Sequence, residues 1–150
     1  MRLYRLCRRG HRALDGEGAL LYGGRWNTPG RPVVYTSRTL SLAALEYLVH
    51  IDPARTPTDL VALTLELPDG LVTALDISKL PSGWRALPAD PACAALGDAW
   101  LDRASSVGWA VPSAVVPVEW NVILDPRHPK FGKVRVVEEE RFAFDPRLVR

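Results

Sequence analysis

The sequence contains little of what metal-binding, secreted or membrane-spanning proteins require. Only two of its 150 residues are cysteines, Cys7 and Cys93, and neither has another cysteine or a histidine at metal-ligand spacing. No apolar run approaches the ~18 residues of a membrane-spanning helix, and arginines interrupt the N-terminal segment almost at once. We therefore expect no metal, no disulfide framework, no membrane association and a cytoplasmic location.

Several catalytic motifs are also missing. The sequence has no phosphate-binding loop ending in Gly-Lys-Ser/Thr, no His-Glu-x-x-His and no Gly-x-Ser-x-Gly, which are typical of nucleoside triphosphatases, metallopeptidases and esterases. Gly16-Glu17-Gly18 begins a dinucleotide-binding fingerprint, but Leu21 stands where its last glycine belongs and no strand leads directly into it. The sequence therefore indicates none of these classes.

Net charge is small and unevenly distributed. The chain carries +2, yet residues 1–12 contain five arginines and no acid. Sixteen of the 19 basic residues are arginine, whose planar guanidinium suits phosphate and carboxylate groups. Because a nearly neutral chain is not typical of a dedicated nucleic-acid-binding protein, we expect no direct nucleic-acid binding. A non-catalytic module that uses the basic segment remains an alternative.

Length and composition favour one folded domain over residues 1–150. Apolar residues make up 47 % and charged residues 24 %, which is close to the globular average. Thirteen prolines, about twice the usual share, interrupt helices and bound strands. We expect an α+β fold in which two or three helices accompany a mixed or antiparallel sheet of six or seven strands.

Local patterns predict where these elements lie. Helical spacing and capping residues predict helices from about residue 39 to 52 and from 91 to 104. Pro68-Asp69-Gly70 predicts a turn that joins two strands as a hairpin, and the glycine-rich segment 16–30 is expected to be an irregular loop. Apolar alternation or β-branched runs predict strands at 3–7, 33–36, 61–67, 71–75, 109–116, 121–124 and 134–137.

Two charged residues are candidates for chemistry. Arg25 lies between Gly23-Gly24 and Gly30, where a ligand could approach the backbone and a guanidinium could clamp a pyrophosphate, or it is simply an exposed loop arginine. Glu46 lies at the border of the helical stripe Leu42, Leu45, Leu48 and Val49. An acid there could be catalytic or could pair with an arginine.

Three uncharged residues have weaker local support. Tyr35, at the end of a strand, could stack on a flat ring or pack in the core. Ser113 is a lone hydroxyl in an apolar strand, which a bond to a neighbouring carbonyl would explain equally well. Asn121 is interpreted as a turn or cap residue unless a pocket includes it.

Taken together, these segments resemble the RES domain family, the toxins of bacterial RES–Xre toxin–antitoxin modules. The intervals of ten residues from Arg25 to Tyr35 and eleven from Tyr35 to Glu46 agree with the family pattern. The resemblance covers nearly the whole chain. Its strongest blocks are Gly16-Glu17-Gly18-Ala19, Gly23-Gly24-Arg25-Trp26-Asn27, Val34-Tyr35-Thr36-Ser37, Ser41-Leu42-Ala43-Ala44-Leu45-Glu46, Leu48-Val49-His50, Gly97-Asp98-Ala99-Trp100, Val111-Pro112-Ser113, and Asn121 with Pro126-Arg127-His128-Pro129.

This resemblance implies an ADP-ribosyltransferase-like fold and an enzyme that uses NAD as its substrate, with no other cofactor. Cleavage of the nicotinamide–ribose bond by hydrolysis or phosphorolysis is the implied reaction, and ADP-ribosylation of a protein is the alternative. It implies catalytic roles for Arg25, Tyr35 and Glu46. Substrate-binding roles fall on four residues, namely Trp26, Asn27, Ser113 and Asn121.

The implied partner is an Xre-family antitoxin with a helix-turn-helix DNA-binding part, which covers the active site of the toxin. A homodimer or a larger assembly with the antitoxin is also compatible with the resemblance.

Overall fold

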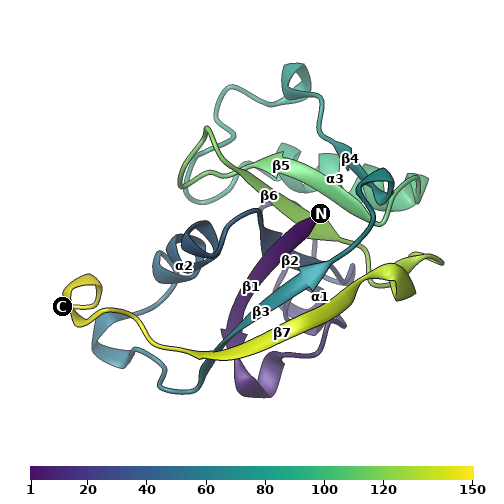
Figure 1. Cartoon of the computed structure of the whole chain (residues 1–150). Helices are drawn as coiled ribbons and strands as arrows, with labels where there is room; N and C mark the ends of the chain where they lie inside the picture. The colour runs from purple at the N-terminus through teal and green to yellow at the C-terminus, as the bar shows by residue number, and fades with distance from the viewer.

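The computed structural model describes residues 1–150 and contains one seven-stranded sheet (Figure 1). All neighbouring strands are antiparallel except β4 and β5, so the sheet is mixed. With three α-helices, this is the expected α+β class. In spatial order the strands are β4 (Val72–Ala74), β5 (Gly108–Pro112), β6 (Trp120–Leu124), β2 (Val34–Ser37), β1 (Arg2–Arg8), β3 (Leu60–Glu66) and β7 (Arg135–Phe142).

The predicted hairpin between the third and fourth strands is wrong. Pro68-Asp69-Gly70 does turn the chain, but it leads into a short 3₁₀ turn at Asp69–Leu71 rather than back along β3. β4 then pairs in parallel with β5, at the opposite end of the strand order from β7. A tight turn in the sequence therefore separates two strands that do not pair.

The glycine-rich segment is more regular than expected, because it contains helix α1 (Glu17–Tyr22). The helix begins after Gly16, whose backbone is left-handed at φ 70°, and just before it the carboxylate of Asp15 accepts a hydrogen bond from the amide of Glu17 at 3.0 Å. Gly23 ends it in the left-handed region at φ 70°. The irregular loop is thus confined to the residues between Gly23 and β2.

Helices α2 (Leu40–Leu48) and α3 (Pro91–Arg103) cover one face of the sheet (Figure 1). Ala43 of α2 packs with Leu6 and Ala62 on the β1 and β3 side. α3, whose N-terminus is capped by Asp90 as predicted, packs over β5 and β6 through Trp100. The site residues lie on the part of this sheet face between the two helices, over the central strands.

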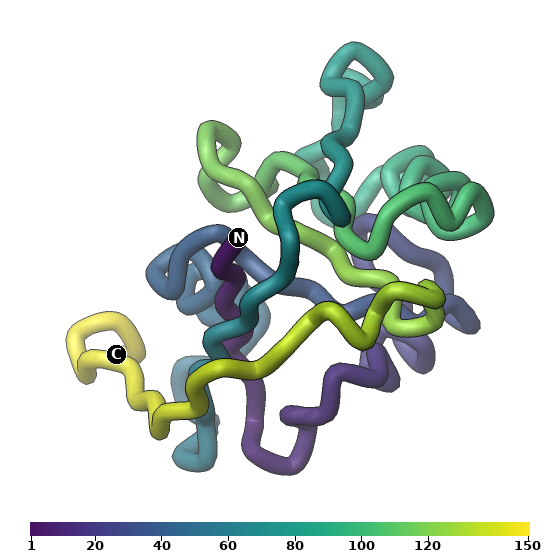
Figure 2. The backbone as a smooth tube through the Cα atoms, turned by 45° about the vertical axis from the view of Figure 1, so that its right-hand side comes forward, coloured from purple at the N-terminus to yellow at the C-terminus, as the bar shows by residue number.

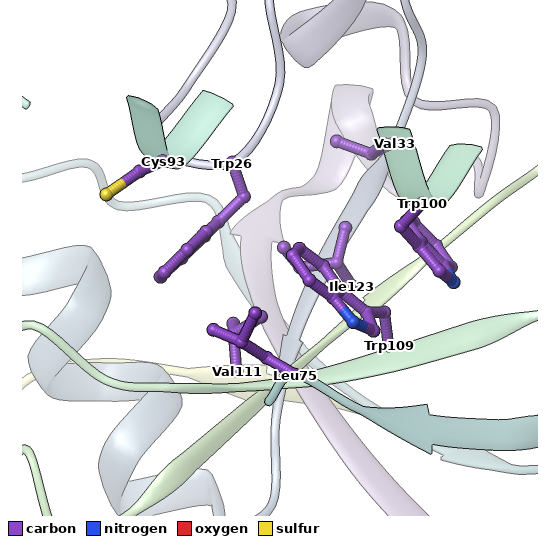
Figure 3. Packing of buried hydrophobic residues seen from close by; sticks show 8 residues of the cluster. All are labelled: Trp26, Val33, Leu75, Cys93, Trp100, Trp109, Val111 and Ile123. Atoms are coloured by element: carbon purple, nitrogen blue, oxygen red, sulfur yellow. The ribbon is translucent and has the colours of Figure 1, made fainter. Parts of the chain in front are cut away.

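A tryptophan-rich core lies under α3 (Figure 3). The rings of Trp100 and Trp109 stack at 5.6 Å, and Trp26 meets Trp109 edge to face at 5.8 Å. Buried aromatic pairs of this kind add about 0.5–1.5 kcal/mol to the area they remove from water. This core fixes the loop that carries Trp26 against β5.

None of the helices is both long and apolar enough to cross a lipid bilayer.

Candidate active site

The candidate residues gather on the sheet face that α2 and α3 cover. Ser37 of β2 pairs with Asn121 of β6, which pairs on its other side with Val111 of β5. Alternate residues of a strand point to the same face, so Tyr35 lies beside Ser37, about 7 Å along β2. Ser113 follows Val111 by two residues, and it leaves β5 on this face.

Helix α2 directs Glu46 toward these strands. The hydroxyl of Thr39 accepts a hydrogen bond from the amide of Leu42 at 3.1 Å, so the helix begins directly after it. Leu42 and Ala43 form the buried side of the helix. Glu46 follows them by three and four residues and therefore lies on the same side, where it is half-buried.

Two neutral side chains hold one oxygen of Glu46. Its Oε1 accepts a hydrogen bond from the Ser113 hydroxyl at 2.6 Å and another from the Asn121 amide at 2.6 Å. Oε2 accepts none, and no arginine or lysine forms an ion pair with the carboxylate. The alternative in which Glu46 pairs with an arginine is therefore wrong. The carboxylate keeps one oxygen available to a ligand.

The hydroxyl of Ser113 is fully used within the protein. It donates to Glu46 and accepts from the backbone amides of Val115 and Val116 at 3.0 and 2.9 Å. A serine hydroxyl has one donor and two acceptor positions, and all three are occupied. The alternative, a bond to a neighbouring carbonyl, is absent because the hydroxyl proton goes to the carboxylate instead. Contact of Ser113 with a substrate stays a prediction.

Tyr35 belongs to a second group of residues, around the Arg25 loop. Its hydroxyl donates to the side-chain oxygen of Asn27 at 2.7 Å and accepts from the amide of Trp26 at 3.2 Å. Burial raises the pKa of the Tyr35 hydroxyl well above its ordinary value. A Cβ at Gly24 would lie 2.5 Å from this hydroxyl, so the close approach of the loop requires glycine there.

The side chains of Trp26 and Asn27 face inward. Asn27 is 1 % exposed, and its amide donates to the carbonyls of Ala19 and Arg31 at 2.9 and 3.0 Å. Trp26 is 4 % exposed within the tryptophan core. The structure thus gives both residues a role in shaping the loop, and their contact with a substrate stays a prediction.

Arg25 is half-buried and binds backbone oxygens. One terminal nitrogen, Nη1, donates to the carbonyls of Trp84 and Ala86 at 2.5 and 3.2 Å. No carboxylate pairs with the guanidinium, which is therefore not the exposed loop arginine of the simpler interpretation. Its positive charge remains free to attract an anion.

The segment Trp84–Ala86, in the long connection from β4 to α3, joins the two residue groups. On one side it accepts the hydrogen bonds of Arg25, and on the other Arg85 Nε donates to the carbonyl of Ala114 at 3.0 Å. Figure 2 shows this connection and the β5–β6 loop rising on the same side of the backbone. This bridge could not be predicted from the sequence, because backbone carbonyls make most of its contacts.

Helix α3 holds the Arg25 loop from behind. Gly97 lies so close to Trp26 that an added Cβ would overlap its carbonyl group. The next residue, Asp98, accepts hydrogen bonds from both the amide and the hydroxyl of Thr28, at 3.1 and 2.7 Å. The Gly97-Asp98 pair therefore fixes the loop and, with it, the position of Arg25.

Comparison with known proteins identifies the family. The family model described as the RES domain matches residues 2–145. The chain belongs to the RES domain family. The suspected resemblance is therefore confirmed, on a match that includes every candidate residue above.

Relatives of this RES domain span its whole length. It is 42 % identical to Toxin Res of Photorhabdus laumondii over all of this chain and 98 % of that protein. It is 32 % identical to the Prs ADP-ribosylating toxin of a Sphingobium strain, over 91 % of this chain and 87 % of that protein. A chain of the crystal structure of the Mycobacterium tuberculosis MbcT–MbcA toxin–antitoxin complex superposes with a TM-score of 0.73 at 22 % identity, covering 99 % of this chain and 86 % of that one. The last match shows that the two chains share their fold over nearly the whole length of this one.

Proposed function

We propose that this RES domain is the toxin of a toxin–antitoxin pair and that it cleaves the nicotinamide–ribose bond of NAD. The observation that carries the proposal is the half-buried carboxylate of Glu46, which neutral donors hold by one oxygen while the other stays free. The full-length similarity to proteins named Toxin Res supports the biological role. NAD is its substrate, and the reaction requires no other cofactor.

The charges around the site match those of NAD. The nicotinamide ring of NAD is positively charged, and its two phosphates are negatively charged. Glu46 would face the ring and ribose, while Arg25, which has no acidic partner, would bind the pyrophosphate. Tyr35 lies two residues before Ser37 on β2, and its hydroxyl bonds to the Arg25 loop, so its ring would contact the nicotinamide.

Glu46 would act mainly through its charge. When the bond between ribose C1′ and the nicotinamide nitrogen breaks, the electron pair stays on nicotinamide and the ribose becomes an oxocarbenium-like cation. A fixed carboxylate stabilises that cation, because its donors are already oriented before the reaction begins. Ser113 and Asn121 would then serve to hold Glu46.

The reaction ends when an acceptor adds to the ribose cation. Water would add its oxygen to C1′ and release one proton, for which Glu46 Oε2 is a suitable base. Inorganic phosphate would add as an anion and would need no base. Hydrolysis and phosphorolysis pass through the same cation, so only the product that forms on C1′ distinguishes them.

Transfer of ADP-ribose to a protein is the second candidate. The similarity to a Prs ADP-ribosylating toxin favours it, because a side chain of a target protein could replace water or phosphate at the same cation. A nucleic-acid-binding module without catalysis has no comparable support. It would leave NAD intact and bind nucleic acid with a steep salt dependence.

The proposed partner is an antitoxin of the Xre family that covers the site in the cytoplasm. Exposed apolar side chains lie on the segments that form the site. Leu45 on α2 and Val49 directly after it are 38 % and 56 % exposed, and Leu87 and Val118, on the connection from β4 to α3 and on the β5–β6 loop, are 83 % and 86 % exposed. Apolar side chains grouped around a polar site are typical of protein interfaces. A complex of toxin and antitoxin among the structural neighbours supports this partner.

The purified chain and NAD alone test the proposed function. We expect nicotinamide to be released, with ADP-ribose as the second product in the absence of phosphate or a phosphorylated ADP-ribose in its presence, identified by mass spectrometry. NAD that stays intact until a cell extract is added, with ADP-ribose then attached to protein, would favour the transferase. NAD that stays intact under all conditions would contradict both.

A further inference from the structure

A buried serine outside the predicted site forms a hydrogen bond with the side chain that holds Glu46. Ser37 is 3 % exposed, and its hydroxyl donates to the Asn121 side-chain oxygen at 2.7 Å. The amide nitrogen of the same side chain donates to Glu46 at 2.6 Å. Ser37, Asn121 and Glu46 thus form one chain of hydrogen bonds from β2 through β6 to α2.

Only one orientation of the Asn121 amide satisfies every group in this chain. An ionised carboxylate can only accept hydrogen bonds, so the amide must present its nitrogen to Glu46. Its oxygen then faces Ser37, whose hydroxyl is the one side-chain donor that reaches it. With Ser37 almost fully buried, water has little access to replace that donor.

We infer that Ser37 is a positioning residue of the site, acting on Glu46 through Asn121. Without the Ser37 hydroxyl, the Asn121 amide loses the hydrogen bond that opposes rotation about its Cβ–Cγ bond. Oε1 of Glu46 then loses a firmly oriented donor. Pre-organised donors matter for catalysis because a misplacement of about 1 Å can cost about a hundredfold in rate. The catalytic consequence rests on the proposed function, whereas the orientation of the amide does not.

The neighbouring Thr36 provides a matched control. Its hydroxyl is also buried and donates to the carbonyl of Val122 at 2.5 Å, between the same two strands but on the opposite face. Thr36→Val and Ser37→Ala therefore each remove one buried hydroxyl bond. Only Ser37→Ala removes one that leads to Glu46.

Two measurements test the inference. In the first, Ser37→Ala should lower kcat for NAD cleavage about tenfold or more, with KM changed less than about twofold, while Thr36→Val keeps kcat near the wild-type value. Adding Ser37→Ala to Asn121→Ala should cause no further loss. A full additional loss in the double variant, or equal losses in kcat for the two single variants, would overturn the inference.

The second measurement does not depend on activity. The side-chain amide protons of Asn121, followed by NMR, should exchange more slowly with solvent in the wild type and in Thr36→Val than in Ser37→Ala. An unchanged Asn121 amide in Ser37→Ala would overturn the positioning role. If the wild type cleaves no NAD, the proposed function fails, but this comparison still decides what Ser37 does.

Discussion

The guanidinium of Arg25 and the backbone carbonyl of Trp84 are in direct hydrogen-bond contact at 2.5 Å. These residues are 59 positions apart in the sequence. The contact means that the expected pyrophosphate-binding residue also anchors the segment that bridges the two halves of the site. A substitution at Arg25 should therefore have two separate effects.

Arg25→Ala should weaken NAD binding about ten- to hundredfold, because a charge-assisted contact contributes about 1.5–3 kcal/mol. It should also increase hydrogen exchange in the segment Trp84–Ala86, which loses its anchor. Calorimetry and exchange mass spectrometry measure the two effects. Arg141→Ala, an exposed arginine on the edge strand β7, is the matched control. Wild-type NAD affinity in Arg25→Ala would exclude the clamp.

Gly97→Ala should destabilise the fold, because the new Cβ overlaps the carbonyl of Trp26 and α3 must shift. Overpacking of this kind costs about 1–3 kcal/mol, which chemical denaturation can measure. Gly18→Ala is the control, since nothing lies within 4 Å of its Cβ position in α1 and alanine favours a helix. Equal unfolding free energies for Gly97→Ala and the wild type would show that α3 does not support the loop in this way.

Tyr35→Phe should change how stability depends on alkaline pH. Burial raises the pKa of Tyr35 in the folded state, while an unfolded tyrosine ionises at about 10. Above about pH 10 the unfolded chain therefore holds fewer protons, and the stability due to this group is lost as pH rises toward the folded pKa. In Tyr35→Phe the unfolding free energy should fall less steeply above pH 10. Tyr22→Phe, at an exposed ring, is the control, and identical slopes for Tyr35→Phe and the wild type would contradict the role of burial.

The antitoxin and NAD should compete. An acidic group of the partner, such as a carboxylate, can occupy the position beside Arg25 that the pyrophosphate would take, because the same guanidinium binds both anions. Partner affinity, measured in Glu46→Gln so that NAD survives, should fall as NAD is raised. Arg25→Ala should weaken the partner less than it weakens NAD, since a protein interface spreads its energy over other contacts. Partner affinity that does not vary with NAD would mean that inhibition acts at a distance.

Local patterns in the sequence predicted the elements that local chemistry determines. The alternation over 61–67 and the Asp90-Pro91 cap correctly placed β3 and α3. The parallel pairing of β4 with β5 could not be predicted, because it depends on contacts between distant segments. The predicted strand 134–137 is the start of β7, which continues to Phe142 through three glutamates that an exposed edge strand tolerates.

The same limit applies to the site. The sequence pattern and the family resemblance pointed to Arg25, Tyr35, Glu46, Ser113 and Asn121, which the structure brings together in two adjoining groups. Neither the sequence pattern nor the resemblance pointed to Ser37, a small residue whose role depends on strand register. Two members of the helical stripe, Leu45 and Val49, are exposed, because α2 covers the sheet only with its Leu42 and Ala43 side.

Nicotinamide release at saturating NAD by the wild type and by Glu46→Gln tests the central claim most directly. The glutamine can still accept hydrogen bonds from Ser113 and Asn121 but carries no negative charge, so NAD binding and the unfolding free energy should change little. Turnover should fall about a hundredfold or more, as expected when a single electrostatic stabiliser is lost. Glu140→Gln on β7 removes the same charge far along the sheet and should keep full turnover. A folded Glu46→Gln protein that binds NAD and releases nicotinamide at the wild-type rate would contradict the account.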